Sequence, residues 1–359
     1  MLRGCIGFLL LPVQPLYAQL WLTAQTYAGT TLRIHPQYPT PTQTATGIEA
    51  GIEWAPDGAA MAGWGSPRAG LVLLHAGTGH PDVLGRGYAL LPYLRWTTQP
   101  WHGWRASCAV GFSLAWLDRP YDRVTNPTNI ATGHALNNLT MLRVQASYEA
   151  RGPLVWHLAL SGFHFSNGHT RYPNLGLNIV GVATGVGYRL GEAAPVAVRS
   201  GRWRRVPLRP GLRLGYGISG GKAPDGPLYP MYTLLVETPW AHWGPATFTA
   251  ALMGFQSGYV QAFVRDHEVP VRSPSRAALG LTANAGARLA LGHFAFQFRV
   301  GPYLRRPYLM DYFLYTELGW EWHFVRPSRQ ALCRPYVGLY VHSHSGEADF
   351  ATCAWGVAF

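Results

Sequence analysis

Residues 154–190 read LVWHLALSGFHFSNGHTRYPNLGLNIVGVATGVGYRL, two alternating segments separated by a polar turn. Alternate side chains of a β-strand point to the same face of the sheet. The large apolar residues on one face are Leu154, Trp156, Leu158 and Leu160 in the first segment and Val180, Val182, Val186, Tyr188 and Leu190 in the second. The turn between the segments contains Gly, Asn and Pro, the residues that favour tight turns. The stretch therefore predicts a β-hairpin with one apolar face.

Three polar residues lie on this apolar face near the turn. If the hairpin is symmetric about Arg171, His164 and Asn178 are opposite each other as a cross-strand pair. Ser166 shares the face of His164 because it lies two residues further along the strand. A serine, a histidine and an amide at the edge of an apolar surface predict chemistry on an apolar substrate.

The composition of the whole chain favours a membrane barrel. Of its 359 residues, 13% are charged and 13% are aromatic, whereas soluble domains carry roughly 25% charged residues. After residue 20 no apolar run approaches the ~18 residues of a transmembrane helix. We therefore expect an all-β fold, an antiparallel transmembrane outer-membrane β-barrel formed by residues 19–359. Counting the candidate segments predicts about 12 to 16 strands. We expect a single barrel, because nothing in the sequence marks a linker between two smaller ones.

Both ends of the sequence indicate export to the bacterial outer membrane. Arg3, followed by a short apolar core, predicts a signal peptide over residues 1–18. The last residues alternate and end at Phe359. A terminal strand of this kind resembles the one that outer-membrane barrels present to the barrel-assembly machinery, so we expect that machinery to be a partner.

The charge of the chain points to anionic partners. The formal net charge is +12, and Lys222 is the only lysine, so the cations are almost all arginines. Arginine binds phosphate groups in a bidentate manner, and in an exported barrel the expected anions are phosphorylated lipid head groups. No run of like charges is long enough to predict nucleic-acid binding.

The cysteines and two alternating histidines leave alternatives open. If the last hairpin turns near Ser343, Cys333 faces Cys353, which predicts either a disulfide or two unpaired thiols in the membrane. Cys5 would leave with the signal peptide. His342 and His344 have a spacing that a metal site can use, but a structural role is the stronger interpretation. The predicted chemistry requires neither a metal nor an organic cofactor.

Several motifs resemble those of the PagL-like lipid A 3-O-deacylases, a group of outer-membrane esterases also classed as acyloxyacyl hydrolase-like. The motif His164-x-Ser166-Asn167 carries this resemblance. Further matching pieces are 77–85, 88–93, 126–131 and 163–178. The resemblance covers roughly residues 30–190, and residues 191–359 share only the pattern of barrel strands.

The resemblance implies a role for each residue of the motif. Ser166 would be the nucleophile, His164 its general base and Asn167 a donor to the oxyanion. These roles fit the chemistry, because a serine hydroxyl needs a base to become nucleophilic and the tetrahedral intermediate needs placed donors. The acid of the family falls at Asn178, where this chain has an amide. An amide can orient the imidazole, but it cannot stabilise the imidazolium by charge.

The sequence thus predicts an outer-membrane esterase that removes an ester-linked acyl chain from lipid A, the anchor of lipopolysaccharide, or from a similar outer-leaflet glycolipid. Its site would be His164, Ser166 and Asn178, with Asn167 at the oxyanion. The alternative is a non-catalytic barrel, either a porin-like channel or a structural protein with a decayed site, and Asn178 favours that alternative. A soluble β-rich secreted protein fits the low charge less well.

Overall fold

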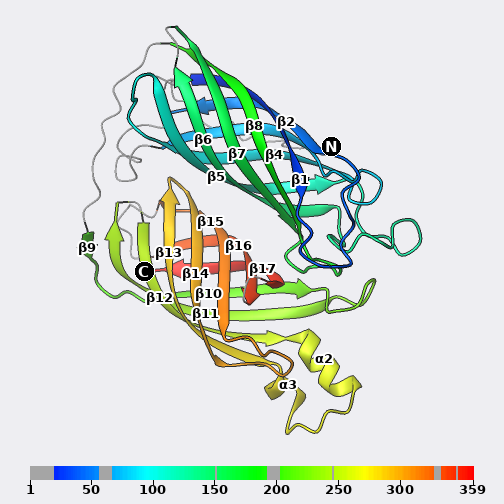
Figure 1. Ribbon diagram of the computed structural model, residues 1–359. Helices are drawn as coiled ribbons and strands as arrows, with labels where there is room; N and C mark the ends of the chain where they lie inside the picture. Colours follow the sequence, from blue (N-terminus) through cyan, green and yellow to red (C-terminus); the bar gives the residue numbers. More distant parts are fainter. Residues whose placement is uncertain are drawn as a thin grey trace, which may run out of the picture.

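The computed structural model describes residues 20–55, 67–149, 152–191, 203–244, 246–326, 333–344 and 347–359. The expected signal peptide therefore lies outside the described residues. The chain forms two antiparallel barrels, which Figure 1 shows as two separate sets of strands. The all-β barrel class that the sequence predicts is confirmed, but the expectation of a single barrel is wrong.

The first barrel is a closed ring of eight strands in sequence order. It closes because β1 pairs antiparallel with β8 from Leu20↔Leu190 to Thr31↔Ile179. Its strands are β1 (Leu20–Thr31), β2 (Ala45–Trp54), β3 (Arg68–Gly77), β4 (Arg86–Thr97), β5 (Trp104–Leu117), β6 (Leu136–Glu149), β7 (Leu154–Ser166) and β8 (Leu177–Leu190).

The second barrel contains the remaining long strands. Strand β10 pairs with both β17 and β11, which closes the ring, and the short β9 adds to the end of β11. The elements are β9 (Trp203–Arg205), β10 (Gly211–Ser219), β11 (Tyr229–Trp243), β12 (Ala246–Ser257), α2 (Gly258–Asp266), α3 (Pro274–Ala277), β13 (Leu279–Leu291), β14 (Phe294–Arg305), β15 (Leu314–His323), β16 (Arg334–His344) and β17 (Glu347–Ala358).

The outer surfaces of the barrels are apolar. Along β7, Leu154, Trp156, Leu158 and Leu160 are exposed while the alternate residues face inward. In a closed antiparallel ring the backbone N–H and C=O groups of each strand form hydrogen bonds with its neighbours. A chain that crosses lipid needs this, because lipid offers no hydrogen-bond partners. With its outward apolar face, this architecture makes the chain an outer-membrane β-barrel protein of the bacterial cell. Neither helix of the described residues has the length and apolar character needed to span a membrane.

The length of the loops assigns the two ends of the barrels. Outer-membrane barrels have short turns on the periplasmic side and longer loops outside. One end carries the connections over 118–135, 167–176 and 258–278, whereas at the opposite end β13 and β14 are joined by a tight turn at 292–293. The end with the long connections is therefore the extracellular end. It includes the turn between β7 and β8.

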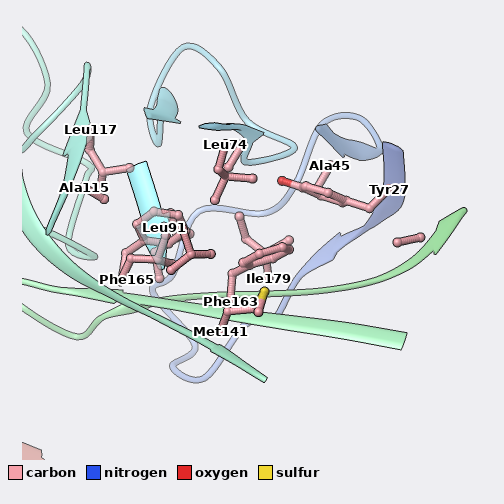
Figure 2. Close-up of a cluster of buried hydrophobic side chains, with 14 of the residues drawn as sticks. Tyr27, Ala45, Leu74, Leu91, Ala115, Leu117, Met141, Phe163, Phe165 and Ile179 are labelled. Carbon is pink, nitrogen blue, oxygen red and sulfur yellow. The ribbon is translucent and has the colours of Figure 1, made fainter. Parts of the chain in front are cut away.

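The interior of the first barrel is filled by side chains. Near the extracellular end, inward-facing residues form an apolar cluster, and Figure 2 shows Phe163, Phe165, Leu91 and Met141 among its members. Below the cluster, buried ion pairs cross the lumen. One of them joins Arg143 to Glu49 at 2.5 Å.

The interior of the second barrel is held by a buried network of arginines and glutamates. Both terminal nitrogens of Arg213 donate to Glu317, at 2.9 and 2.5 Å. The guanidinium of Arg288 bridges Glu237 and Glu321, at 2.5 and 2.6 Å. A barrel of this strand number is only wide enough for side chains to fill it, and these pairs together with the surrounding tyrosines do so.

The two barrels touch along their walls, where the rings of Phe112 and Trp320 lie 5.2 Å apart, and at their extracellular ends. The backbone N–H of Gly220 donates to the carbonyl of His169 at 2.8 Å, and the ring Nε2–H of His169 donates to the carbonyl of Gly221 at 2.5 Å. Arg171 forms a salt bridge with Asp225 at 3.2 Å. The β7–β8 turn of the first barrel is thus attached to the β10–β11 turn of the second.

The cysteine pair expected to face each other does not. Cys353 lies opposite Leu339, because β16 and β17 turn between His344 and Glu347 rather than near Ser343. Cys108, Cys333 and Cys353 are free thiols in the described residues. The disulfide alternative is therefore wrong. Cys5 lies outside the described part of the chain.

Candidate functional site

The hairpin of β7 and β8 brings His164 and Asn178 together. The two residues are register partners, as the symmetry of the turn predicts. The imidazole Nδ1 lies 2.8 Å from the amide Oδ1 of Asn178. A carbonyl oxygen can only accept a hydrogen bond, so Nδ1 carries the proton and donates it. The other nitrogen, Nε2, then has a free lone pair, which is the form that a general base needs.

His164 is exposed on the outer wall of the barrel. Its neighbours on that wall are apolar, since Leu160 and Val182 are 62% and 56% exposed. Because this wall faces lipid and His164 is near the extracellular end, the imidazole lies at the level of the outer leaflet.

Ser166, the last residue of β7, is buried although His164 is not. Its Oγ lies 3.0 Å from Nδ2 and 3.3 Å from Oδ1 of Asn174, and it accepts a hydrogen bond from the backbone N–H of Gly168 at 3.2 Å. Within the described residues, no hydrogen bond joins Ser166 to His164. The turn therefore folds over the hydroxyl and holds it beside an amide.

The structure places Asn167 next to Ser166 but turns its side chain away. Its Nδ2 donates to the carbonyl of Arg171 at 2.8 Å, while its backbone N–H donates to Oδ1 of Asn174 at 2.9 Å. The side-chain amide of Asn167 is thus engaged in shaping the turn. Its Oδ1 is buried without a partner among the described atoms.

Asn174 is the residue that the sequence reasoning missed. It bonds both the hydroxyl of Ser166 and the backbone of Asn167. Its side-chain N–H group is therefore the donor nearest to the hydroxyl that would attack an ester. In the sequence Asn174 follows Pro173, where an asparagine predicts no more than a turn. The one feature that could have identified it is its position in the short turn between Ser166 and Asn178, two candidate residues of the site.

Glycine at 176 lets the turn pass close to the imidazole. Gly176 has a φ of +77°, and a Cβ there would lie 2.8 Å from Cε1 of His164. The carbonyl of Gly176 accepts a hydrogen bond from Tyr38 at 3.0 Å, and its N–H donates to Ala131 at 2.9 Å. Two other extracellular loops thus fix the turn against His164.

The second barrel also supports this turn. A Cβ added at Gly168 would lie 3.3 Å from Val341 of β16 and 3.5 Å from Ala351 of β17. Residue 168 is the same glycine whose N–H bonds Ser166. The wall of the second barrel therefore lies against the loop that covers the candidate nucleophile.

The remaining histidine candidates belong to the second barrel's interior and rim. His342 is fully buried, and its two ring nitrogens lie 2.6 Å from the hydroxyl of Tyr315 and 2.8 Å from that of Thr352. His344 stacks on Tyr312. The described residues contain no group of three or more side chains that could hold a metal ion.

Comparison with known proteins adds little to this description. No protein-family profile and no curated protein sequence matches the chain. Among solved structures, the chain is similar to a mutant of the porin of Rhodopseudomonas blastica, with 9% identity, coverage of 95% of this chain and 99% of that one, and a TM-score of 0.18. It is also similar to OccK5 of Pseudomonas aeruginosa, with 11% identity, coverage of 95% and 97%, and a TM-score of 0.21. At such scores the likeness carries no argument about function.

Proposed function

We propose that this protein is an outer-membrane esterase that removes an ester-linked acyl chain from lipid A or a similar glycolipid. The observation that carries the proposal is the hydrogen bond from Nδ1 of His164 to Oδ1 of Asn178. It fixes the imidazole on the lipid-facing wall in the tautomer that can accept a proton from a serine.

In this proposal Ser166 attacks the ester carbonyl and His164 takes its proton through Nε2. The negative charge that develops on the ester oxygen requires donors placed in advance. Asn174 is the candidate closest to the hydroxyl, since its Nδ2 lies 3.0 Å from Ser166 Oγ. His164 would then return the proton to the leaving alcohol, and water would hydrolyse the acyl-enzyme by the same route. For His164 and Ser166 to form a hydrogen bond, the hydroxyl of Ser166 must first give up its hydrogen bonds with Asn174. Catalytic hydrogen bonds often form only when substrate is bound.

The position of the site supports a lipid substrate. The acyl chains of an outer-leaflet lipid run along the apolar wall formed by residues such as Leu160 and Val182, and the ester groups lie near the head group. His164 is on the same wall at the extracellular end, so an ester can reach it without leaving the membrane.

The competing proposal is a non-catalytic barrel, and Asn178 favours it, because a carboxylate would stabilise the protonated imidazole better. A porin-like channel is the weaker form of this alternative. The buried pairs Arg143–Glu49 and Arg213–Glu317 and the apolar cluster occupy the interiors, which argues against an open aqueous path.

The test is mass spectrometry of lipid A from cells without lipid A deacylases. The cells express the wild type, Ser166→Ala or an empty vector, and heat-modifiable migration on gels confirms that each barrel is folded. Loss of one acyl chain in the wild type alone is the expected result. Unchanged lipid A with a folded barrel overturns the esterase proposal, and single-barrel conductance in planar bilayers then tests the channel.

A further inference from the structure

Four arginines line one cavity at the extracellular end of the second barrel. Arg272 and Arg276 come from the segment between α2 and β13, Arg305 is the last residue of β14, and Arg306 follows it. The cavity has a volume of about 450 Å³, within the range of sites for small molecules or head groups. Figure 1 shows α2 and α3 projecting beyond the strands at this end.

The cavity has a frame of backbone contacts that joins its two walls. The N–H of Tyr308 donates to the carbonyl of Ala277 at 2.8 Å. Arg305 donates from Nη2 to the carbonyl of Arg276 at 2.7 Å and from Nε to that of Leu279 at 3.2 Å. Beneath this frame, Val260 and Val264 of α2 form a buried apolar cluster with Ala278, the residue that follows α3. The walls are therefore fixed before any ligand arrives.

The positive charge in the cavity is not neutralised by the protein. Among the described residues, no carboxylate lies within the 4.0 Å of a salt bridge from any of the four guanidinium groups. Asp266, on the same connection, is paired with Arg265, and Asp311 offers only its backbone carbonyl to Arg306 at 2.9 Å. In contrast, Arg213 and Arg288 of the interior are paired with glutamates.

Unpaired cations that share one cavity repel one another. An anion bound between them is attracted to each of them and offsets this repulsion. Guanidinium groups present planar pairs of donors that match the oxygens of a phosphate. Arg272 and Arg276 have no side-chain hydrogen bond in the described residues, so all their donors are available to a ligand, and both side chains are exposed.

We infer that this arginine cavity binds a phosphate group, as a phosphomonoester or a diphosphate. Two sources have this chemistry at the outer surface of the membrane: the phosphorylated head group of a glycolipid and a free phosphate or diphosphate. The inference does not rest on the esterase proposal, because the cavity lies on the second barrel and uses none of the residues around Ser166.

The test measures binding to the full-length protein in lipid nanodiscs. The three probes are lipid A with both phosphates, the same glycolipid with its phosphates removed, and inorganic pyrophosphate alone. The test variant is Arg272→Gln together with Arg276→Gln, which removes two charges without breaking the frame. The control is Arg265→Gln, which removes an exposed charge on α2 outside the cavity.

The double variant should bind phosphorylated lipid A at least about tenfold more weakly than the wild type, since each arginine supplies a charge-assisted hydrogen bond. The control should bind as the wild type does, and the dephosphorylated lipid should bind no better to the wild type than to the double variant. Binding of pyrophosphate that is lost in the double variant supports a phosphate site, and together with weak lipid binding it identifies the free anion as the source.

Equal affinity of the wild type and the double variant for both phosphate probes overturns the inference. So does equal affinity of the wild type for the phosphorylated and dephosphorylated lipids when pyrophosphate does not bind. A failure of the esterase proposal leaves this result unaffected, because the four arginines belong to the second barrel and Ser166 to the first.

Discussion

Nδ1 of His164 donates a hydrogen bond of 2.8 Å to Oδ1 of Asn178, the position at which a carboxylate would complete a catalytic triad. The amide oxygen fulfils one of the two roles of a carboxylate, because it holds the imidazole in a single tautomer. It does not fulfil the other, because it carries no charge to stabilise the imidazolium that would form in the proposed esterase when Ser166 loses its proton.

Under the proposed esterase mechanism, Asn178→Asp should therefore raise the rate of acyl release. The tautomer is already the productive one, so the gain should be well below the ~10⁴ that separates a carboxylate from an amide in the wrong tautomer; at least about tenfold is expected. The measurement is the rate of fatty-acid release from lipid A by the purified protein. No increase in a folded Asn178→Asp protein would contradict the role given to this pair.

Asn174→Asp should remove most of the activity while keeping the shape of the turn. The carboxylate still accepts the hydrogen bond from the backbone of Asn167, which the amide accepts at 2.9 Å, but it cannot donate to Ser166 or to an oxyanion. Loss of one such donor costs about 10²–10³ in kcat. Steady-state kinetics should show the loss in kcat rather than in KM; a change confined to KM would assign Asn174 to substrate binding alone.

Under the proposed esterase mechanism, Gly176→Ala should abolish acyl release without removing any reacting group. The new Cβ would lie 2.8 Å from the imidazole of His164 and would displace it from Asn178. The control is Gly152→Ala, since Gly152 also has a positive φ, of 118°, but has no atom within 4 Å of the added Cβ. Both variants carry the backbone strain of the left-handed region. At least tenfold lower acyl release in the first variant alone is the expected result, and equal loss in both would point to backbone strain as the cause.

Glu317→Gln should destabilise the second barrel strongly. Arg213 would then be buried beside a neutral side chain, and a broken buried pair costs about 3–5 kcal/mol of the free energy of unfolding. The control is Arg265→Gln, which breaks the exposed pair with Asp266 and should change the stability far less, because solvent screens an exposed ion pair. Urea unfolding in detergent micelles, followed by heat-modifiable migration, measures both. Similar losses in the two variants would mean that the interior pair is not structural.

The junction of the two barrels should weaken in acid. Burial lowers the pKa of His169, with Lys222 acting in the same direction, although the carbonyl of Gly221 and the charge of Glu347 oppose the shift. The folded turn therefore prefers neutral His169. Above the usual histidine pKa of about 6.5 the contact is fully stable; as pH falls below it, the opened turn takes up a proton more readily than the folded one, and stability is lost.

Hydrogen exchange of residues 166–178 measures this effect. Exchange corrected for its intrinsic rate should be faster at pH about 5 than at pH about 8. His169→Asn should abolish the difference, because asparagine does not titrate and accepts the φ of 61° found at this residue. A pH dependence that persists in this variant would assign the effect to another group.

The local part of the site could be predicted from sequence because strands have a fixed period. Alternation placed Leu158 and His164 on one face, and the symmetry of the turn placed His164 opposite Asn178. The burial of Ser166 could not be predicted, since it results from a turn that folds back through Asn174 and from the wall of the second barrel at Val341. Neither contact leaves a periodic signal.

The number of barrels could not be predicted from the sequence for a similar reason. Alternation identifies a strand and its two faces, but it does not identify the strand's partner. The ring closes where β8 meets β1, from Leu190↔Leu20 onward, and the same alternating pattern would serve equally in a longer sheet. The wrong partner predicted for Cys353 has the same origin. A small shift of the last turn changes the residue opposite Cys353 from Cys333 to Leu339.

The closure of β1 on β8 has a consequence for the topology of the protein. Each ring is sealed along its own seam, and in the described part of the chain no strand pairing joins residues up to 191 to residues from 203 onward. A single cut in the connecting segment would leave both seams whole, with the two halves held only by contacts such as that of His169 with Gly221. The two barrels thus belong to one polypeptide, but their strand pairing is that of two separate subunits.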